Sequence, residues 1–224
     1  MITDLFYYDS VDGWQNIRPF HIEVLMRFSI IIPAHNSATR IQPMLDSIKT
    51  QTCKDYELIV VCDACEDETE KVAKFYGART FNIEAHNSAA GRNKGLDEAR
   101  GDWVLFCDDD DYWTHPFALD HISKCIDAGI VTADMTQCAF IFGERGLQPA
   151  HGRIWPNVWS KIFRREGIGD TRFTLEDFPA DDLGFVRRML AKGVTIDWQP
   201  LLWYYYVYPR IGSIMWGIEH EGVR

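Results

Sequence analysis

The stretch from residue 28 to residue 107 alternates short apolar runs with segments in which apolar residues recur at helical spacing. The runs are rich in isoleucine and valine and nearly continuous, which is typical of strands buried on both faces of a sheet. Strands that alternate with helices predict an α/β fold with a parallel sheet and right-handed crossovers. The expected strands are 28–32, 56–61, 78–83 and 102–107, and the expected helices start near Ile41, Thr69 and Ser88.

The alternation breaks down from about Gly129 onward. In this half we expect strands at 129–135, 139–142, 194–198 and 201–208, a loop with glycine and proline at 143–156, and a helix at 182–192. Residues 1–27 show no clear period and form an N-terminal extension without an assigned role. A chain of 224 residues suits one domain, so 28–135 and 136–224 are expected to be two halves of it.

Composition excludes several classes of function. The formal net charge of −10 repels nucleic acid and anionic membranes, so nucleic acid is not an expected partner. No apolar run reaches the roughly 18 residues of a membrane helix and no secretory signal opens the chain, so we expect a cytoplasmic protein without a transmembrane segment. Cys62-x-x-Cys65 lacks a second ligand pair at zinc spacing, and the six cysteines are expected to be buried or unreactive thiols. Metal-ligand spacing is also absent among the loop histidines His35, His86, His115 and His151.

Three polar segments follow expected strands directly. They are Pro33-Ala34-His35-Asn36, Cys62-Asp63-Ala64-Cys65 and Asp108-Asp109-Asp110-Asp111. In open parallel sheets the ligand lies beyond the carboxyl ends of the strands, where such segments meet. Periodicity alone therefore predicts a binding site built from these three loops.

The acidic run Asp108–Asp111 is the sharpest of the three segments. Adjacent carboxylates repel one another unless solvent or a cation offsets the charge. Oxygen ligands at the end of a buried strand suit Mg²⁺ or Mn²⁺, and such an ion can bridge the two phosphates of a nucleotide. The alternative is a solvated acidic turn before a helix.

Each of the other candidate residues has one functional and one purely structural interpretation. Asp63 ends a strand and can accept hydrogen bonds from a base or ribose, or serve as a turn or N-cap residue. Arg92, followed by Asn93, can meet phosphate oxygens at a helix start, or lie at the surface. The adjacent pair Asp181–Asp182 can raise one carboxyl pKa and supply a base, or cap the helix that follows.

These segments, taken together and in order, resemble family 2 glycosyltransferases. The resemblance covers about residues 28–215 and includes the A-R-N-x-G, D-x-D, W-x-K-L-[YF]-R and E-D-x-x-[LF]-x-x-R motifs of that family. The matching segments are Ser29–Asn36, Leu45–Thr52, Tyr56–Asp63, Gly91–Leu96, Trp103–Asp111, Trp159–Arg164 and Asp182–Arg188.

The resemblance implies a single GT-A domain, with a mostly parallel Rossmann-like sheet flanked by helices and a smaller C-terminal half that binds the acceptor. It also implies transfer of a sugar from a nucleotide diphosphate donor, with a UDP-sugar expected, usually with inversion and with Mn²⁺ or Mg²⁺. Asp108 and Asp110 are then the metal ligands, and Asp182, with Asp181 as its rival, is the catalytic base. The implied donor contacts are Pro33, Ala34, His35, Asn36, Asp63, Arg92, Asn93, Asp108 and Asp109.

The acceptor is not specified by the sequence, and a glycan, a lipid-linked sugar or a protein are all open. Trp155, Trp159 and Trp203 are candidate platforms for a sugar ring, with core packing as the alternative. The oligomeric state is equally open.

Three departures from the family pattern bear on the site. Cys62 replaces the first aspartate of the usual D-D-G-S-T-D, which leaves Asp63 alone in the nucleoside role. Asp181 replaces a glutamate in the base motif, and the stretch 204–209 lacks the histidine that helps many members bind metal. Two other classes remain as rivals: a nucleotidyltransferase, although Pro33–Arg40 is no glycine-rich basic loop, and a non-catalytic nucleotide or carbohydrate binder.

Overall fold

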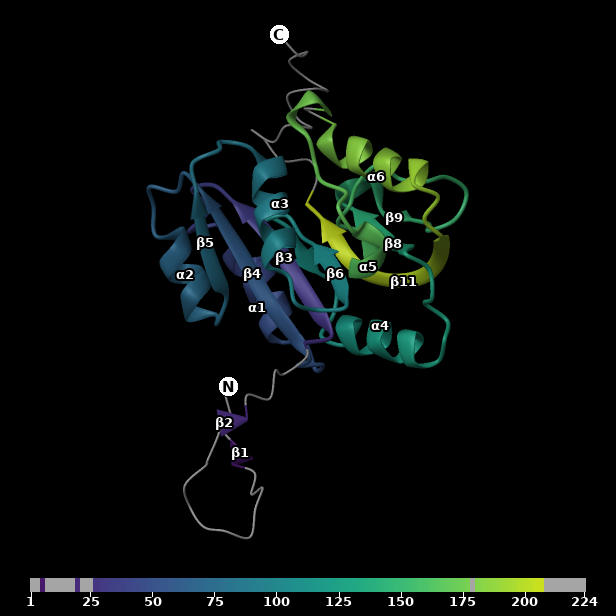
Figure 1. Cartoon of the computed structure of the whole chain (residues 1–224), viewed down its shortest axis with the longest axis horizontal. Helices are drawn as coiled ribbons and strands as arrows, with labels where there is room; N and C mark the ends of the chain where they lie inside the picture. Colours follow the sequence, from purple (N-terminus) through teal and green to yellow (C-terminus); the bar gives the residue numbers. More distant parts are fainter. Residues whose placement is uncertain (1–4, 7–18, 21–25, 178–179, 208–224) are drawn as a thin grey trace.

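The computed structural model describes residues 5–6, 19–20, 26–177 and 180–207 (Figure 1). Its strands are β1 (Leu5–Phe6), β2 (Pro19–Phe20), β3 (Phe28–Ala34), β4 (Tyr56–Asp63), β5 (Arg79–Ile83), β6 (Trp103–Phe106), β7 (Tyr112–Trp113), β8 (Met135–Phe142), β9 (Leu147–Gln148), β10 (Lys161–Arg164) and β11 (Ile196–Tyr206). Its helices are α1 (Gln42–Lys49), α2 (Thr69–Phe75), α3 (Ser88–Glu98), α4 (Ala118–Asp127), α5 (Arg165–Ile168) and α6 (Asp181–Ala191), with 3-10 turns η1 (Gly143–Arg145) and η2 (Leu175–Asp177).

One nine-stranded sheet runs through the domain in the order β5-β4-β3-β6-β10-β8-β11-β7, with β9 paired to β8. Strands β5, β4, β3, β6, β8 and β11 run in one direction, and β10, β9 and β7 run against them. The predicted α/β fold with a mostly parallel sheet is confirmed. Because β10 joins β6 to β8, the sheet is continuous across the expected division at residue 135.

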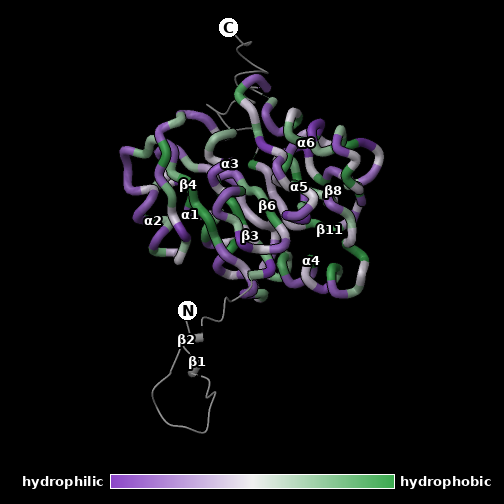
Figure 2. The backbone as a smooth tube through the Cα atoms, viewed as in Figure 1, coloured by the Kyte–Doolittle hydropathy of each residue, from purple (hydrophilic) through white to green (hydrophobic). Residues whose placement is uncertain are grey.

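Helices cover both faces of this sheet. Side chains alternate along β3, so Phe28, Ile30 and Ile32 pack with α1 and α4 in one buried cluster. Ile31 faces the other way and packs with α3 and α6 in a second cluster. Hydrophobic colouring follows β3 and β4 through the middle of the molecule in Figure 2. Burial on both faces is the physical reason why these strands read as continuous apolar runs.

The strands and helices expected between residues 28 and 107 lie where the periodicity predicts them, with ends that shift by a few residues, whereas β7 and α4 were not expected. Strand β3 extends through Pro33 to Ala34, where it pairs with β4 alone, because its pairing with β6 ends at Ile31. The chain from 1 to 27 contributes the described pair β1–β2, which is antiparallel and separate from the main sheet.

Two expectations for the second half are wrong. The expected strand 129–135 is a turn that follows helix α4, and strand β8 starts only at Met135; Gly129, with φ +67°, lies just after the helix end. The strands expected at 194–198 and 201–208 are one strand, β11, whose register shifts on either side of Leu202 accommodate Pro200. Tyr208 lies outside the described residues.

Candidate active site

A cleft of about 840 Å³ opens at the carboxyl ends of β3, β4 and β6. The three polar loops predicted to converge there all contribute to its lining. From the first half the lining residues are Pro33, Ala34, His35, Arg40, Asp63, His86, Asn87, Ser88, Arg92, Asp108, Asp109 and Asp110. From the second half they are Phe140, Phe142, Arg145, Arg153, Trp155, Pro156, Asn157, Trp159, Ala180, Asp181, Asp182, Leu183 and Tyr206.

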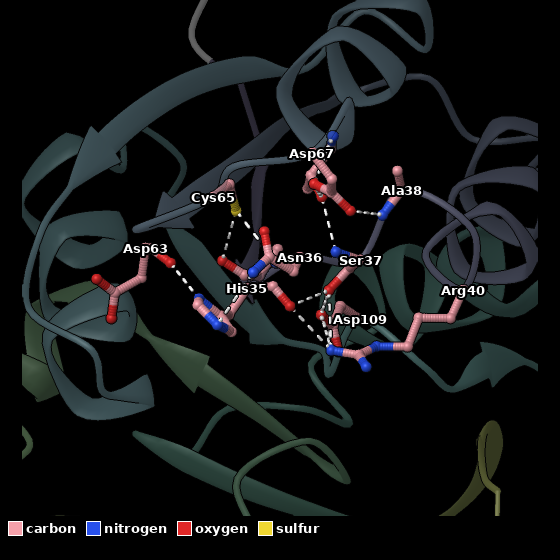
Figure 3. A network of polar contacts seen from close by, with 11 residues as sticks. His35, Asn36, Ser37, Ala38, Arg40, Asp63, Cys65, Asp67 and Asp109 are labelled. Carbon is pink, nitrogen blue, oxygen red and sulfur yellow. Dashed lines mark hydrogen bonds and ion pairs between the residues drawn. The ribbon is translucent and has the colours of Figure 1, made fainter.

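The loop after β3 is fixed by the loop after β4 (Figure 3). His35 Nδ1 lies 2.6 Å from the main-chain oxygen of Asp63, which must accept, so Nδ1 carries the hydrogen and Nε2 is left as an acceptor. Asn36 turns back at φ +46° and accepts the main-chain N–H of Glu66 on Oδ1. Asp67 accepts the main-chain N–H of Ala38 at 2.9 Å. These contacts give the loop one shape and direct His35 into the cleft.

Asp63 is fixed by main-chain donors. Its carboxylate accepts the N–H groups of Ala85, His86 and Asn87 at 2.7, 2.8 and 2.6 Å, and the residue is 5% exposed. The carboxylate thereby anchors the turn that leads into helix α3, whose N-cap is Asn87. The sequence predicts Asp63 as the nucleoside contact. In the structure Asp63 lines the cleft and also anchors the turn before helix α3.

The four aspartates after β6 have different environments. Asp111 is fully buried and accepts the Tyr204 hydroxyl and the Val207 N–H, both at 2.8 Å. Asp109 accepts the Ser37 hydroxyl and pairs with Arg40 at 3.6 Å. Asp108 and Asp110 line the cleft. The run is thus a folded turn in which Asp111 is buried in the structure and the other three aspartates line the cleft.

Arg92 lies at the centre of the site, where it connects the two halves of the domain. Its guanidinium contacts Asp108 and Asp181 at 2.9 Å and Asp182 at 3.4 Å, and the residue is 6% exposed. Burial disfavours the charge, but the three carboxylates outweigh it and raise the pKa of Arg92. Arg92, the predicted phosphate contact, is therefore also the group that binds both candidates for the catalytic base.

Asp181 and Asp182 are adjacent but not equivalent. Asp181 accepts the Ser88 hydroxyl at 3.1 Å and Arg92 Nη1 at 2.9 Å. Asp182 accepts the Val158 N–H on Oδ2 at 3.0 Å, while its buried Oδ1 has no hydrogen-bond partner among the described residues. Burial, helped by Asp108 and Asp181 and opposed by Arg92, raises the pKa of Asp182 to about 6. Asp182 is the carboxylate better suited to accept a proton near neutral pH.

An aromatic wall faces these polar groups. Trp159 stacks on Tyr206 at 4.9 Å and meets Phe140 edge-on at 4.8 Å. Trp155 also meets Phe140 edge-on, at 5.2 Å, and the Arg153 guanidinium lies 3.5 Å over the Trp155 ring. Rings and guanidinium planes of this kind offer flat contact surfaces with polar edges.

Three predicted contacts lie away from the cleft lining. Trp203 is 1% exposed and packs edge-on against Trp113 in the core, so core packing, the alternative for this residue, is correct. Asn93 bonds both main-chain groups of Phe173, because α3 must be fixed to the segment before α6. The side chain of Asn36 is hydrogen-bonded to the Glu66 N–H and to the His35 ring.

Sequence reasoning did not single out Arg40, Ser88 or Tyr204. Each acts through a partner distant in the chain: Asp109, Asp181 and Asp111 respectively. The one available signal was the excess of carboxylates in the three loops, since these carboxylates need hydrogen-bond donors from other parts of the chain.

The carboxylates suit a metal that is shared with a ligand. Among the described residues, no three His, Cys, Asp or Glu side chains are grouped closely enough to bind a metal by themselves. Asp108 and Asp110 supply hard oxygen ligands at the cleft surface. Mg²⁺ is typically bound by one or two carboxylates together with substrate phosphates, and this donor set fits that pattern.

Comparison with known proteins gives a consistent picture. The family model described as glycosyl transferase family 2 matches residues 29–194. The putative glycosyltransferase EpsH of Bacillus subtilis is 25% identical over 209 residues, covering 79% of this chain and 60% of EpsH. The uncharacterized glycosyltransferase YwdF of the same organism is 34% identical over 119 residues, covering 51% of this chain and 44% of YwdF. The chain thus spans about half the length of these relatives.

Solved structures agree on the fold. TarS of S. aureus in complex with UDP superposes with a TM-score of 0.73 at 24% identity, covering 81% of this chain and 60% of that one. The mannosyltransferase PcManGT of Pyrobaculum calidifontis, in complex with GDP-Man and Mn²⁺, gives a TM-score of 0.67 at 20% identity, covering 86% and 60%. None of the described helices is long and apolar enough to cross a membrane. The fold is of the GT-A type, and the chain belongs to glycosyl transferase family 2.

Proposed function

We propose that this chain transfers a sugar from a nucleoside diphosphate sugar to an acceptor hydroxyl, with a divalent metal and with inversion at the anomeric carbon. The observation that carries the proposal is the meeting in one cleft of the Asp108–Asp110 turn, buried Arg92 and a carboxylate of raised pKa, Asp182. Structural neighbours in complex with UDP, UDP-GlcNAc and GDP-Man support a nucleotide-sugar donor, and we expect a UDP-sugar.

The donor occupies the first half of the cleft in this proposal. The nucleoside lies against His35 and Asp63, both of which line this part of the cleft. Asp108 and Asp110 bind Mn²⁺ or Mg²⁺ together with the diphosphate, and neighbours that contain Mn²⁺ support this cofactor. When bound, the ion supplies charge that stabilises the diphosphate as it leaves.

Asp182 acts on the acceptor from the second half. The acceptor oxygen forms a bond to the anomeric carbon, its proton passes to Asp182, and the bond from that carbon to the diphosphate oxygen breaks with its electron pair. Attack from the side opposite to the leaving group inverts the centre. Arg92 keeps Asp182 near Asp108, so base and leaving group are placed together. Trp155 and Trp159 offer the surface for an acceptor that is a glycan, a lipid-linked sugar or a protein.

The test incubates the chain with a panel of nucleoside diphosphate sugars and Mn²⁺ and measures release of the nucleoside diphosphate, with and without a mixture of sugar acceptors. Release from one donor, stimulated by acceptor, is the expected result. Pyrophosphate release from a nucleoside triphosphate and a sugar phosphate would instead favour the rival nucleotidyltransferase. Binding of nucleotide without turnover in any combination would favour a non-catalytic binder.

A further inference from the structure

A buried polar pair lies behind the acceptor side of the cleft and takes no part in the mechanism above. Gln137 on β8 and Lys161 on β10 face each other as register partners, and both are fully buried. Buried side chains of this kind are rare unless they are hydrogen-bonded. Their partners are all main-chain groups of one segment, residues 150–158.

The two side chains fix this segment at several points. Gln137 Nε2 donates to the oxygens of Ala150 and Arg153 at 2.6 and 2.9 Å, and its Oε1 accepts the Trp155 N–H at 2.7 Å. Lys161 Nζ donates to the oxygens of Trp155, at 2.8 Å, and Asn157. Segment 150–158 has no helix or strand to pair its main-chain N–H and C=O groups. The side chains of Gln137 and Lys161 therefore provide the hydrogen bonds that a neighbouring strand would otherwise supply.

The segment leads directly to the active site. Arg153, Trp155, Pro156 and Asn157 line the cleft, and the next N–H, that of Val158, donates to Asp182 Oδ2 at 3.0 Å. A shift of the segment therefore moves the aromatic wall and the base contact together. We propose that Gln137 and Lys161 are positioning residues, which set the acceptor surface and the Val158–Asp182 contact; the catalytic part of this inference rests on the proposed function.

The chemistry of Lys161 suits an anchor. Burial, opposed by the nearby Asp182, lowers the pKa of Lys161 to about 7. A neutral amine still has two hydrogens for its two carbonyl partners, so the anchor works on either side of that pKa. Methionine matches the length of glutamine, is one atom shorter than lysine and has no donor, which makes Gln137→Met and Lys161→Met the informative changes.

The chain provides a matched control in Gln51. This residue is 1% exposed and also fixes main chain, donating to Ser47 and His115 oxygens and accepting the Leu119 N–H, but it lies outside the cleft lining. Gln51→Met should lower stability to a similar degree. It should leave both segment 150–158 and turnover close to their wild-type behaviour.

The experiment compares amide hydrogen exchange, UDP affinity with Mn²⁺ and nucleoside diphosphate release in the full chain and the three variants. We expect peptides from 150–158 to exchange roughly tenfold or more faster in Gln137→Met and Lys161→Met. Turnover should fall by roughly 10²-fold, since small misplacements of reacting groups cost about that much, while UDP affinity stays within about twofold.

Unchanged exchange in 150–158 would overturn the inference, as would a turnover loss no greater than that of Gln51→Met. If Lys161→Met does not fold, Gln137→Met decides the question alone. A wild-type chain that consumes no nucleotide sugar would refute the proposed function and with it the catalytic part of this inference, whereas the exchange data would still decide whether the pair anchors the segment.

Discussion

The cleft wall built from residues 33–111 and the wall built from residues 140–206 differ in what surrounds their polar groups. On the first wall, the carboxylates of Asp63 and Asp109 line the cleft although both residues are buried, and neighbouring donors fix each of them. On the second wall, the aromatic rings of Trp155 and Trp159 share the lining with Asp181 and Asp182, and the buried pair Gln137–Lys161 fixes the segment from behind. The difference suits a first wall that binds a ligand of constant charge and a second wall whose shape can vary with the acceptor.

The largest effect should come from the carboxylate between the two walls. Asp182→Asn keeps the size of the side chain but cannot take a proton. General-base catalysis is typically worth about 10²–10⁴-fold, so turnover should fall by that factor while donor affinity barely changes. Turnover is measured as nucleoside diphosphate release, and affinity by calorimetry with a donor and Mn²⁺.

Asp181→Asn is the control for this prediction. Asp181 already accepts bonds from Ser88 and Arg92, so its loss should disturb position and give a smaller decrease. Near-normal turnover in Asp182→Asn would show that the base is elsewhere. Near-normal turnover in both variants would mean that the pair only caps helix α6.

The next effect concerns the metal on the first wall. Chelation with EDTA, or Asp110→Asn, should weaken binding of a nucleoside diphosphate by roughly ten- to a hundredfold, because charged contacts of about 1.5–3 kcal/mol are lost. Asp109→Asn is the comparison, since Asp109 is engaged by Ser37 and Arg40 and should matter less. Equal affinity with and without EDTA would contradict the metal role.

A smaller effect on nucleotide affinity is expected at Asp63, where a substitution should also lower the stability of the fold. Asp63→Asn replaces an acceptor of three main-chain N–H groups and should lower the free energy of unfolding by about 1–3 kcal/mol. Nucleotide affinity should fall about tenfold because the 85–87 turn also borders the cleft. Urea unfolding and calorimetry measure the two. Asp67→Asn, at the neighbouring exposed loop, should change affinity much less.

The first wall was also the more predictable from sequence. Continuous runs such as Ile30–Ile32 exist because β3 is buried on both faces, and the loops that follow such strands have to meet at one edge. The partners of Asp63 were not predictable, because they are main-chain groups of residues 85–87 with no side-chain signature. Helix α4 was not predicted, although its buried residues Ala118, Leu119 and Ile122 form a stripe like that of α1.

On the second wall, aromatic residues alone could not separate surface from core. Trp155 and Trp159 line the cleft, whereas Trp203 is in the core, and the sequence around the three offers no consistent difference. Their placement depends on register shifts in β11 and on the Gln137–Lys161 anchors, both of which are properties of the assembled sheet.

The smallest expected effect is a pH dependence of turnover that reports the ionisation of the base. Burial raises the pKa of Asp182 to about 6, and the base works only when ionised, so kcat/KM should fall as the pH drops through that value. Relative to pH 8, about half the activity should remain at pH 6 and about a tenth at pH 5. An intact donor sugar has no phosphate group that titrates in this range, so donor affinity should stay constant. The residual activity of Asp182→Asn should lose the acid limb. A limb near pH 4 in the wild type, or one that persists in the variant, would place the base on another carboxylate.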